Sequence, residues 1–564
     1  TCTTSNPAAS SGAFYNCTQL ESINLPERIE TIPQYTFYSC RGLESITIPA
    51  SVKNKTNDKG EITVYAIQNS AFENCSGLVT LTFANGNPNE VTIGPNAFKS
   101  CSKLETVNLP KGLTYIKKFD DNGNDVSDYY DVFAADAFAG CSKLNTLNVE
   151  TGGKYYTDDG IIYYHDIITD EDGEVTEEIR EVILCSQSRT KAVVIPYNVT
   201  SINARAFTTC YNITSFSFQP TPEGETEVDL KINDASNDAD AVARKSGAFN
   251  WFIGITTLEL PARLTYIGDY GFYDCSMLRA LTIGENSRLT HVGKYAFAKC
   301  NGLSIIRVPA TVKKIGDSAF DGCTRITDFT FEDDSQLTEI GDRAFAQTSF
   351  TEIVIPNTVK ILGSSMFYGS RLTTITLPSS LSELDVATFA GCDNIESITL
   401  TGNTKYYIND IVIYNAAMTE LMLYPANKRS ESYVVLEGVT TIDAGAFAGN
   451  TYLKNVTIPN TVSTIGAGAF YGCTNLQTVY FTPDNATTKE TDLKIGGTKD
   501  TIGVFQGCSS LKTVNLPERT TGLGLYAFAD CAKLTELTIH QAAQIPAINA
   551  GVFSHAGGGT LTLP

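Results

Sequence analysis

The stretch Ala319–Phe331 reads AFDGCTRITDFTF, and variants of it recur along the whole 564-residue chain. Three of these variants are AFKSCSKLETVNLP from Ala97, AFYGCTNLQTVYF from Ala469 and AFADCAKLTELTI from Ala527. The shared frame is A-F-x-x-C-x-x-L-x-x-I-x-I-P-x-x-V-x-x-I-G. Such a repeat predicts one continuous array, in place of the three or four domains that the length alone suggests.

The repeat occurs in eighteen copies, each marked by one phenylalanine of the frame. The closest copies are 22 to 26 residues apart, which lies within the period of about 20–29 residues that is typical of leucine-rich repeats. The marking residues are Phe14, Phe37, Phe72, Phe98, Phe138, Phe207, Phe249, Phe272, Phe297, Phe320, Phe345, Phe367, Phe389, Phe447, Phe470, Phe505, Phe528 and Phe553.

Each part of the frame predicts one element of a coil. L-x-x-I-x-I alternates apolar and polar residues, so we expect a half-buried strand that ends at the following proline. A-F-x-x-C is expected to form a short helical turn with its phenylalanine and cysteine facing inward, and V-x-x-I-G a second short extended piece. Because one coil cannot bury its apolar face alone, the coils must stack on a continuous core. The predicted fold class is a mostly β leucine-rich-repeat solenoid of about eighteen coils with β-hairpin insertions.

Longer spacings predict six insertions into a single array that covers residues 1–564. They lie near residues 53–66, 118–132, 154–195, 220–245, 403–436 and 482–500. The third and fifth resemble each other, since KYYTDDGIIYY at Lys154–Tyr164 matches KYYINDIVIYN at Lys405–Asn415. Each of these two predicts a β-hairpin unit that replaces a coil. The first continues into Asp166–Glu181, which has eight acids and one arginine and is expected to be a solvated loop.

The ends of the chain carry no atypical capping repeat. Because solenoids normally need such caps, we expect the sequence to be a fragment of a larger protein.

Thirteen of the fifteen cysteines occupy the same position of the frame. This pattern predicts a column of small buried thiols, each a weak donor to a turn carbonyl. A metal ladder or a disulfide chain is less favoured, because Asn450 replaces the cysteine in one copy and Cys-x-x-Cys never occurs. Cys2 and Cys185 lie off the frame and are the disulfide candidates.

Charge and motifs argue against several functional classes. The net charge of −21 and the pI near 4.7 disfavour nucleic acid, which needs clustered basic residues, and favour a soluble monomer. No apolar run approaches the ~20 residues of a membrane span. His165, His291, His540 and His555 are scattered and no catalytic or nucleotide motif occurs, so we predict no catalytic residue, metal or cofactor. The acidic stretches at 120–131 and 170–173 do not match a calcium-loop spacing.

At this frame the sequence closely resembles the BspA-type leucine-rich repeats of bacterial surface proteins, which also occur in some protozoan parasites. The resemblance covers nearly the whole chain. It implies a secreted or cell-surface protein that binds a protein or glycan ligand, often for adhesion, with host extracellular matrix as one candidate. Two alternatives stay open. The array could be the structural stalk or spacer of a larger surface protein, or an enzyme with an unrecognised carboxylate site.

The solvent-facing strand residues are the natural place for a ligand in such repeats. The central residue of I-x-I is threonine or asparagine in thirteen of the eighteen copies, which predicts a plain polar sheet surface. Interface hot spots favour tryptophan, tyrosine and arginine, so the binding candidates are Arg307 and Tyr480 on this face. Tyr163 and Tyr164 in the first hairpin are further candidates, although their repetition also predicts packing within the hairpin. The lone Trp251 is expected in the core.

Overall fold

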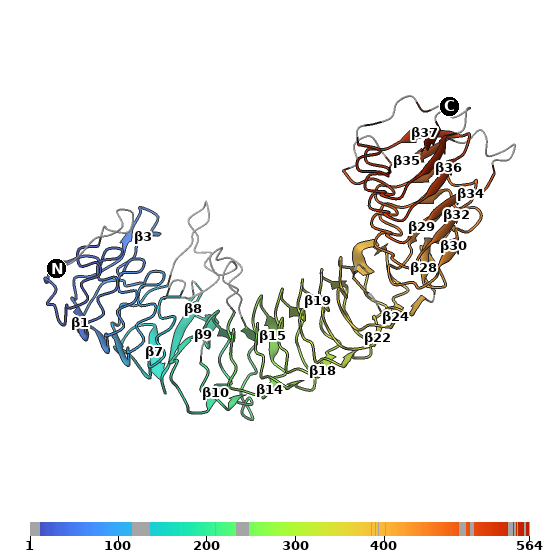
Figure 1. Ribbon diagram of the computed structural model, residues 1–564. Coiled ribbons are helices and arrows are strands. Elements are labelled where there is room, and N and C mark those ends of the chain that lie inside the picture. Colours follow the sequence, from blue (N-terminus) through green and yellow to red (C-terminus); the bar gives the residue numbers. More distant parts are fainter. Residues whose placement is uncertain are drawn as a thin grey trace. The chain divides into compact units, whose positions relative to one another are not determined.

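The computed structural model divides into two compact units, Thr1–Arg325 and Ile326–Pro564. Each unit is a β-solenoid, and the two together contain about 18 turns (Figure 1). The structure describes residues 12–115, 133, 136–170, 172–208, 210–232, 247–384, 386–389, 391–392, 394–400, 402–483, 492–496, 501–539, 545, 549, 551–557 and 560–562.

In unit 1 the I-x-I segments form the strands of a first face, and they pair in parallel from coil to coil. The alternation is visible in β18, where Ile306 and Val308 are buried and Ile305 and Arg307 are exposed. These strands are β1 (Ser45–Ile48), β4 (Thr80–Phe83), β5 (Thr106–Leu109), β6 (Thr146–Val149), β10 (Val193–Ile195), β12 (Phe216–Phe218), β14 (Thr257–Leu260), β16 (Ala280–Ile283) and β18 (Ile305–Val308).

The V-x-x-I segments of unit 1 form a second, separate parallel sheet. Its strands are β11 (Ser201–Ile202), β13 (Leu230–Ile232), β15 (Leu264–Ile267), β17 (His291–Val292) and β19 (Lys314–Ile315). The coils from β11 to β19 therefore contribute to two faces, as the frame predicts, whereas the described residues of the coils before them meet on the second face only through isolated bridges such as Ile32–Ile67 and Ile67–Ile93.

Unit 2 repeats this arrangement. The strands of its first face are β20 (Asp328–Phe331), β22 (Glu352–Val354), β24 (Thr374–Leu377), β26 (Ser397–Leu400), β30 (Ser432–Val434), β32 (Asn455–Ile458), β34 (Thr478–Phe481), β36 (Thr513–Leu516), β38 (Glu536–Ile539) and β39 (Thr560–Thr562). The strands of its second face are β21 (Glu339–Ile340), β23 (Ile361–Leu362), β25 (Glu383–Leu384), β29 (Glu420–Leu423), β31 (Thr441–Ile442), β33 (Thr464–Ile465), β35 (Leu493–Ile495) and β37 (Thr520–Leu523).

The A-F-x-x-C segment differs from the expected helical turn in one detail. It forms two successive hydrogen-bonded turns, for example from the Tyr38 N–H to the Tyr35 carbonyl and from the Cys40 N–H to the Phe37 carbonyl. Tyr35 and Ser39 have φ angles of 58° and 56°, and such left-handed residues interrupt a right-handed helical run. Among the described residues the one helical element is the 3-10 helix Val386–Phe389, and no helix there could cross a membrane.

The core of each unit is a stack of the frame phenylalanines. In unit 1 the Phe72 ring lies between those of Phe37 and Phe98, with centroid distances of 5.0 and 4.9 Å. In unit 2 the Phe447 and Phe470 centroids are 4.5 Å apart. Stacked pairs of this kind contribute about 0.5–1.5 kcal/mol beyond the burial of their area. Coil-to-coil contact is thus built into the repeat.

The two similar insertions form antiparallel meanders. In the first, β7 (Tyr155–Asp158) pairs with β8 (Ile161–Thr169), and β8 pairs with β9 (Val175–Cys185). In the second, β27 (Tyr406–Asn409) pairs with β28 (Val412–Asn415), and β28 pairs with β29. The last strand of each meander then pairs in parallel with the next coil, β9 with β11 and β29 with β31. Each meander thus starts a new second-face sheet.

The other insertions are less uniform. The one near residues 53–66 is an antiparallel hairpin of β2 (Lys55–Thr56) and β3 (Ile62–Val64). The segments 220–245 and 482–500 contain β13 and β35, which are regular members of the second-face sheets. The segment 118–132 lies outside the described residues. That the two units act as one array stays a prediction.

Candidate binding surfaces

The cysteine column is buried, and its thiols point at the preceding coil. The Cys75 Sγ donates to the Phe37 carbonyl at 2.9 Å, and the Cys101 Sγ donates to the Phe72 carbonyl at 3.2 Å. Burial raises the pKa of the Cys141 thiol to about 12, so this thiol is protonated and unreactive at neutral pH. The same bond is made by Cys40, Cys141, Cys275, Cys300, Cys323, Cys473, Cys508 and Cys531. The column is structural, as predicted.

Asn450, Cys17 and Cys185 differ from the regular thiols of this column. Asn450 replaces a cysteine, and its Nδ2 donates to the Pro425 and Lys428 carbonyls at 3.0 and 3.1 Å. Cys17 is disulfide-bonded, which the column prediction missed. Cys185, expected as a disulfide candidate, is a free buried thiol, and Cys2 lies outside the described residues.

The polar ladder on the first face satisfies part of its own hydrogen bonding. The Asn108 Nδ2 donates to the Thr82 Oγ1 at 3.1 Å, and the Asn148 Nδ2 donates to the Asn108 Oδ1 at 2.7 Å. In unit 2 the Thr376 and Thr399 hydroxyls lie 2.9 Å apart. Because these side chains form hydrogen bonds with one another, fewer hydrogen-bond donors on this face remain available for a ligand.

The two candidates on this face are accessible. Arg307 is exposed in β18, and Tyr480 in β34 has 51% of its surface exposed. They lie in different units and therefore do not form one described site. The same face also exposes Val354 and Val434, at 58% and 65%, although valine is not a typical hot-spot residue.

The other two candidates, Tyr163 and Tyr164, are buried, with 3% and 0% of their surface exposed. The Tyr163 ring stacks on Tyr156 at 5.3 Å, and the Tyr164 hydroxyl donates to the Asp166 Oδ2 at 2.8 Å. Packing inside the hairpin is thus confirmed. A binding role for this pair is not supported, because neither ring presents a surface to a ligand.

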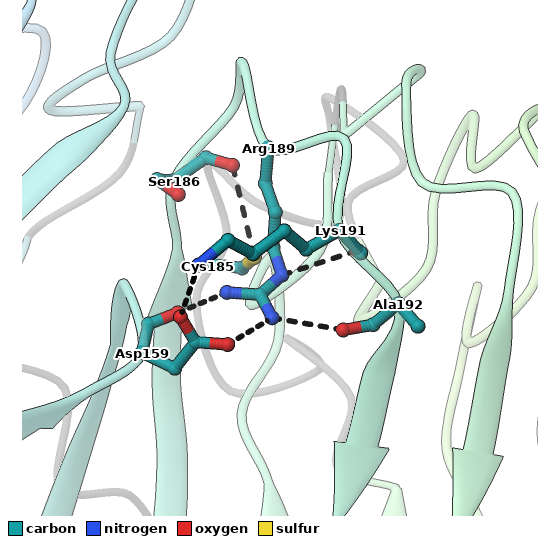
Figure 2. A network of polar contacts seen from close by, with 6 residues as sticks. All are labelled: Asp159, Cys185, Ser186, Arg189, Lys191 and Ala192. Atoms are coloured by element: carbon teal, nitrogen blue, oxygen red, sulfur yellow. Dashed lines mark hydrogen bonds and ion pairs between the residues drawn. The ribbon is translucent and has the colours of Figure 1, made fainter.

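A polar network holds the tip of the first meander against the following chain (Figure 2). Asp159 and Gly160 have φ angles of 41° and 77°, as a type I′ turn requires. The Arg189 guanidinium, whose side chain is only 7% exposed, donates to the Asp159 carboxylate at 2.7 Å and to the Ala192 carbonyl at 2.8 Å. It also bonds the Asp159 and Lys191 carbonyls. The Arg189 hydrogen bond lowers the pKa of Asp159.

The second meander has a matching clamp at its own tip. The Lys428 Nζ donates to the Asp410 carboxylate at 2.6 Å and to the Asp410 carbonyl at 3.1 Å. Tyr424 occupies the place of Cys185, and its ring stacks on Phe447 at 4.7 Å. Both clamps close a hairpin turn with a cation whose side chain is at most 10% exposed.

The acidic stretch after the first hairpin is not the solvated loop that its composition predicts. It forms the outer parts of β8 and β9, which pair as far as Thr169 and Val175. We call the exposed part, residues 167–170 and 172–178, the β8–β9 arm. Its turn is closed by the Asp170 Oδ1, which accepts the Asp172 and Glu174 N–H groups. The missed signal was the β-branched run on either side of an Asp-Gly turn.

An acidic groove of about 770 Å³ lies between β20 and β22 in unit 2. Asp328, Glu352 and the run Glu332–Asp334 line it, and no basic residue does. The strand β22 begins a new sheet at this point. The coil is one residue shorter from Phe345 to Ile353 than a regular coil such as Phe447–Val456.

The remaining candidate chemistry is dispersed over the described residues. The His165 Nε2 lies 2.9 Å from the Glu178 Oε1, the His291 ring stacks on Tyr266, and the His555 Nδ1 lies 3.2 Å from the Asp530 Oδ1. His540 lies outside the described residues, as does the acidic stretch at 120–131. No group of three or more metal-binding side chains occurs in the described part of the chain.

The lone tryptophan was expected in the core, and this prediction is wrong. Trp251 has a φ of 57° and is 39% exposed, while Phe252 fills the core position that cysteine takes in other coils. Trp251 lies one residue before the core position of the frame. It occupies the left-handed turn position, where side chains point to solvent.

Comparison with known families and structures gives a consistent result. A model described as a BspA type leucine rich repeat region matches residues 56–120, 125–223, 244–363, 334–433 and 491–558. Together these residues make up well over half of the chain. No curated protein sequence matches.

Several solved structures are similar to the chain. One is a leucine rich cell surface protein from Faecalibacterium prausnitzii, with 23% identity and a TM-score of 0.43, which covers 73% of this chain and 94% of its own. Another is the pneumococcal vaccine antigen PcpA, with 19% identity and a TM-score of 0.40, covering 70% and 83%. A third is a leucine-rich repeat protein from Eubacterium ventriosum, with 23% identity and a TM-score of 0.40, covering 50% and 84%.

Proposed function

The chain belongs to the BspA-type leucine-rich repeat family, and from this premise we propose that it is a secreted or cell-surface binding protein. Its exposed strand residues and hairpins would present a surface to a protein or glycan ligand, including host extracellular matrix. The chain itself would act as a monomer and without catalysis.

The observation that supports this proposal most is that the side chains that join the coils lie in the core, whereas the outward-facing side chains of the strands are exposed. The phenylalanine stack and the cysteine column hold neighbouring coils together from within. Stability therefore does not depend on the outer side chains of the strands. The Tyr480 side chain remains 51% exposed, and tyrosine is one of the residue types that carry much of the energy in protein interfaces.

The test is a binding screen of the purified chain against immobilised matrix proteins and a glycan array. We expect at least one specific ligand, with binding reduced by Tyr480→Ala or Arg307→Ala. Thr457→Ala, on the strand paired with Tyr480, is the matched control and should bind normally. Protease treatment of intact source cells should remove the protein if it is surface-exposed, and sedimentation should give a monomer.

A structural stalk or spacer is the second candidate, and the self-bonded Asn108–Asn148 ladder favours it. A spacer needs a stable, polar, unreactive surface, which this ladder provides. A uniformly negative screen together with high stability would favour the spacer over the binding protein.

A further inference from the structure

The β8–β9 arm extends beyond the strands that flank its base. On one side β7 pairs only with Ile161–Tyr164 of β8. On the other side β11 pairs only with Glu181 and Val182 of β9. Further out, β8 and β9 pair only with each other in the described part of the chain, through Ile167–Glu178 and Ile168–Glu177. The arm is therefore a two-stranded ribbon with two edges.

The β9 edge is the more open of the two. The Arg180 N–H donates to the Thr200 Oγ1, and the Arg180 carbonyl accepts the Thr200 N–H at 2.8 Å. Residues two apart on a strand direct their backbone groups to the same side. The N–H and carbonyl of Glu178 therefore point to the same edge as those of Arg180, but they lie beyond the reach of Thr200. On the β8 edge the Ile167 N–H is already bonded to the Asp166 Oδ1 at 3.1 Å.

Apolar side chains lie on both faces of the ribbon. Ile167 and Ile168 are 51% and 40% exposed, and Val175 is 62% exposed. Successive residues of a strand point to opposite faces, so Ile167 and Ile168 cover one face each. A strand added beside β9 would lie next to Val175, which belongs to β9, and would shield that side chain. A two-stranded ribbon alone is only marginally stable in water, so a third strand would also stabilise the arm.

The negative charge of the arm determines which kind of strand can pair with its edge. Glu177 and Glu178 are adjacent and point to opposite faces, and the segment Asp166–Glu181 has Arg180 as its one lysine or arginine. The Arg180 Nη2 lies 3.1 Å from the Glu178 Oε1. Like charges directly opposite one another across strands are destabilising. Two copies of this edge therefore repel, whereas a basic strand is attracted.

We propose that the β9 edge of the arm binds an extended segment of a partner protein by strand addition. That segment carries two adjacent basic residues opposite Glu177 and Glu178, with β-branched residues beside them. Backbone hydrogen bonds supply affinity in such complexes and the alternating side chains supply specificity. The inference rests on the proposed binding function and names its partner class.

The probe is a fluorescent peptide, Thr-Val-Lys-Arg-Val-Thr-Val, titrated with the full chain and followed by anisotropy. A second peptide, Thr-Pro-Lys-Arg-Pro-Thr-Val, has the same charge but cannot complete the backbone ladder. We expect the first peptide to bind and the second to bind about tenfold more weakly or not at all. Equal binding of the two would mean simple charge attraction and would overturn strand addition.

The second meander supplies the template for a variant without the arm. Residues 165–180 are replaced by Asn-Ala-Ala-Met-Thr, the sequence of Asn415–Thr419, which joins β28 to β29. This variant should keep its circular dichroism spectrum and lose peptide binding. Glu177→Lys, on the exposed part of the ribbon, should weaken binding about tenfold even if the shortened variant fails to fold.

Two further outcomes separate this inference from its rivals. Peptide binding that survives both variants would place the site elsewhere and overturn the proposal. Self-association of the wild-type chain that the shortened variant loses would show a second copy on the edge, and would also overturn it. A third result would separate the two proposals. If the wild type failed to bind the peptide, strand addition at the arm would be wrong. If the shortened variant nevertheless bound a matrix or glycan ligand found for the wild type, the general binding function would stand.

Discussion

The two meanders have the same sequence frame and the same strand order, yet they differ at three places. The first closes its turn with Asp159-Gly160 and the second with Asp410-Ile411. The first extends into a long arm, whereas β28 and β29 have four residues each. Beside the last strand, the first places Asn203 and the second Asp443 in the next coil. The body of a meander is thus fixed by its fit to the coils, while its tip and its flank are free to vary.

The shared cation clamp gives the largest expected effect. Arg189→Met leaves the Lys191 and Ala192 carbonyls without their donor, so we expect a loss of about 3 kcal/mol in unfolding free energy. Lys428→Met loses only the bonds to Asp410, whose side chain is 79% exposed and can rehydrate, so about 1 kcal/mol is expected. Denaturant unfolding of both variants measures the difference. Equal losses would show that the extra bonds of the arginine add nothing.

Asp443, beside the last strand of the second meander, makes the stability of that meander depend on pH. Burial raises the pKa of Asp443 to about 7, and a hydrogen bond and charge repulsion with Glu420 add to this rise. Between about pH 4 and pH 7 the folded chain keeps a proton that the unfolded chain has lost. Stability therefore falls as pH rises through this window and is lowest above pH 7.

Asp443→Asn copies the first meander and should remove this pH dependence. Because the side chain is only partly buried, solvent screening limits the gain at pH 8 to on the order of 1–2 kcal/mol. The reverse change, Asn203→Asp beside the buried Glu181, should create a similar fall of stability with pH. Melting temperatures between pH 4 and pH 8 test both variants, and a flat wild-type profile would contradict the raised pKa of Asp443.

The turn residues give the smallest effect. Ile411 has a φ of 60°, which is strained for a β-branched residue by about 1–2 kcal/mol. Ile411→Gly should therefore stabilise the second meander by about 0.5–1 kcal/mol, after the entropy cost of glycine. Gly160→Ile should destabilise the first, since a Cβ there would lie 3.1 Å from the Ser186 Oγ. Hydrogen exchange at the two turns reports the change, and a loss of protection in Ile411→Gly would refute the strain.

The coil could be predicted from sequence because every part of its frame has one local physical cause. The phenylalanine stack, the buried thiols and the two faces all follow from that frame. The arm could not be recognised because acidic composition hid its strand pattern at Ile167–Thr169. Trp251 was misplaced because a one-residue offset decides between core and solvent. Tyr163 and Tyr164 show the same limit, since sequence repetition alone does not say whether a shared tyrosine packs or binds.

The restart of the second-face sheet at each meander has a mechanical consequence. The antiparallel strands β7–β8 and β27–β28 interrupt the parallel ladder, and one core cluster ends at Ile183 while another begins at Val412. Solenoid stability is a sum over neighbouring coils, so an interrupted ladder divides the chain into blocks that open separately. Under a pulling force such a protein would yield in steps, block by block, and would dissipate the load gradually.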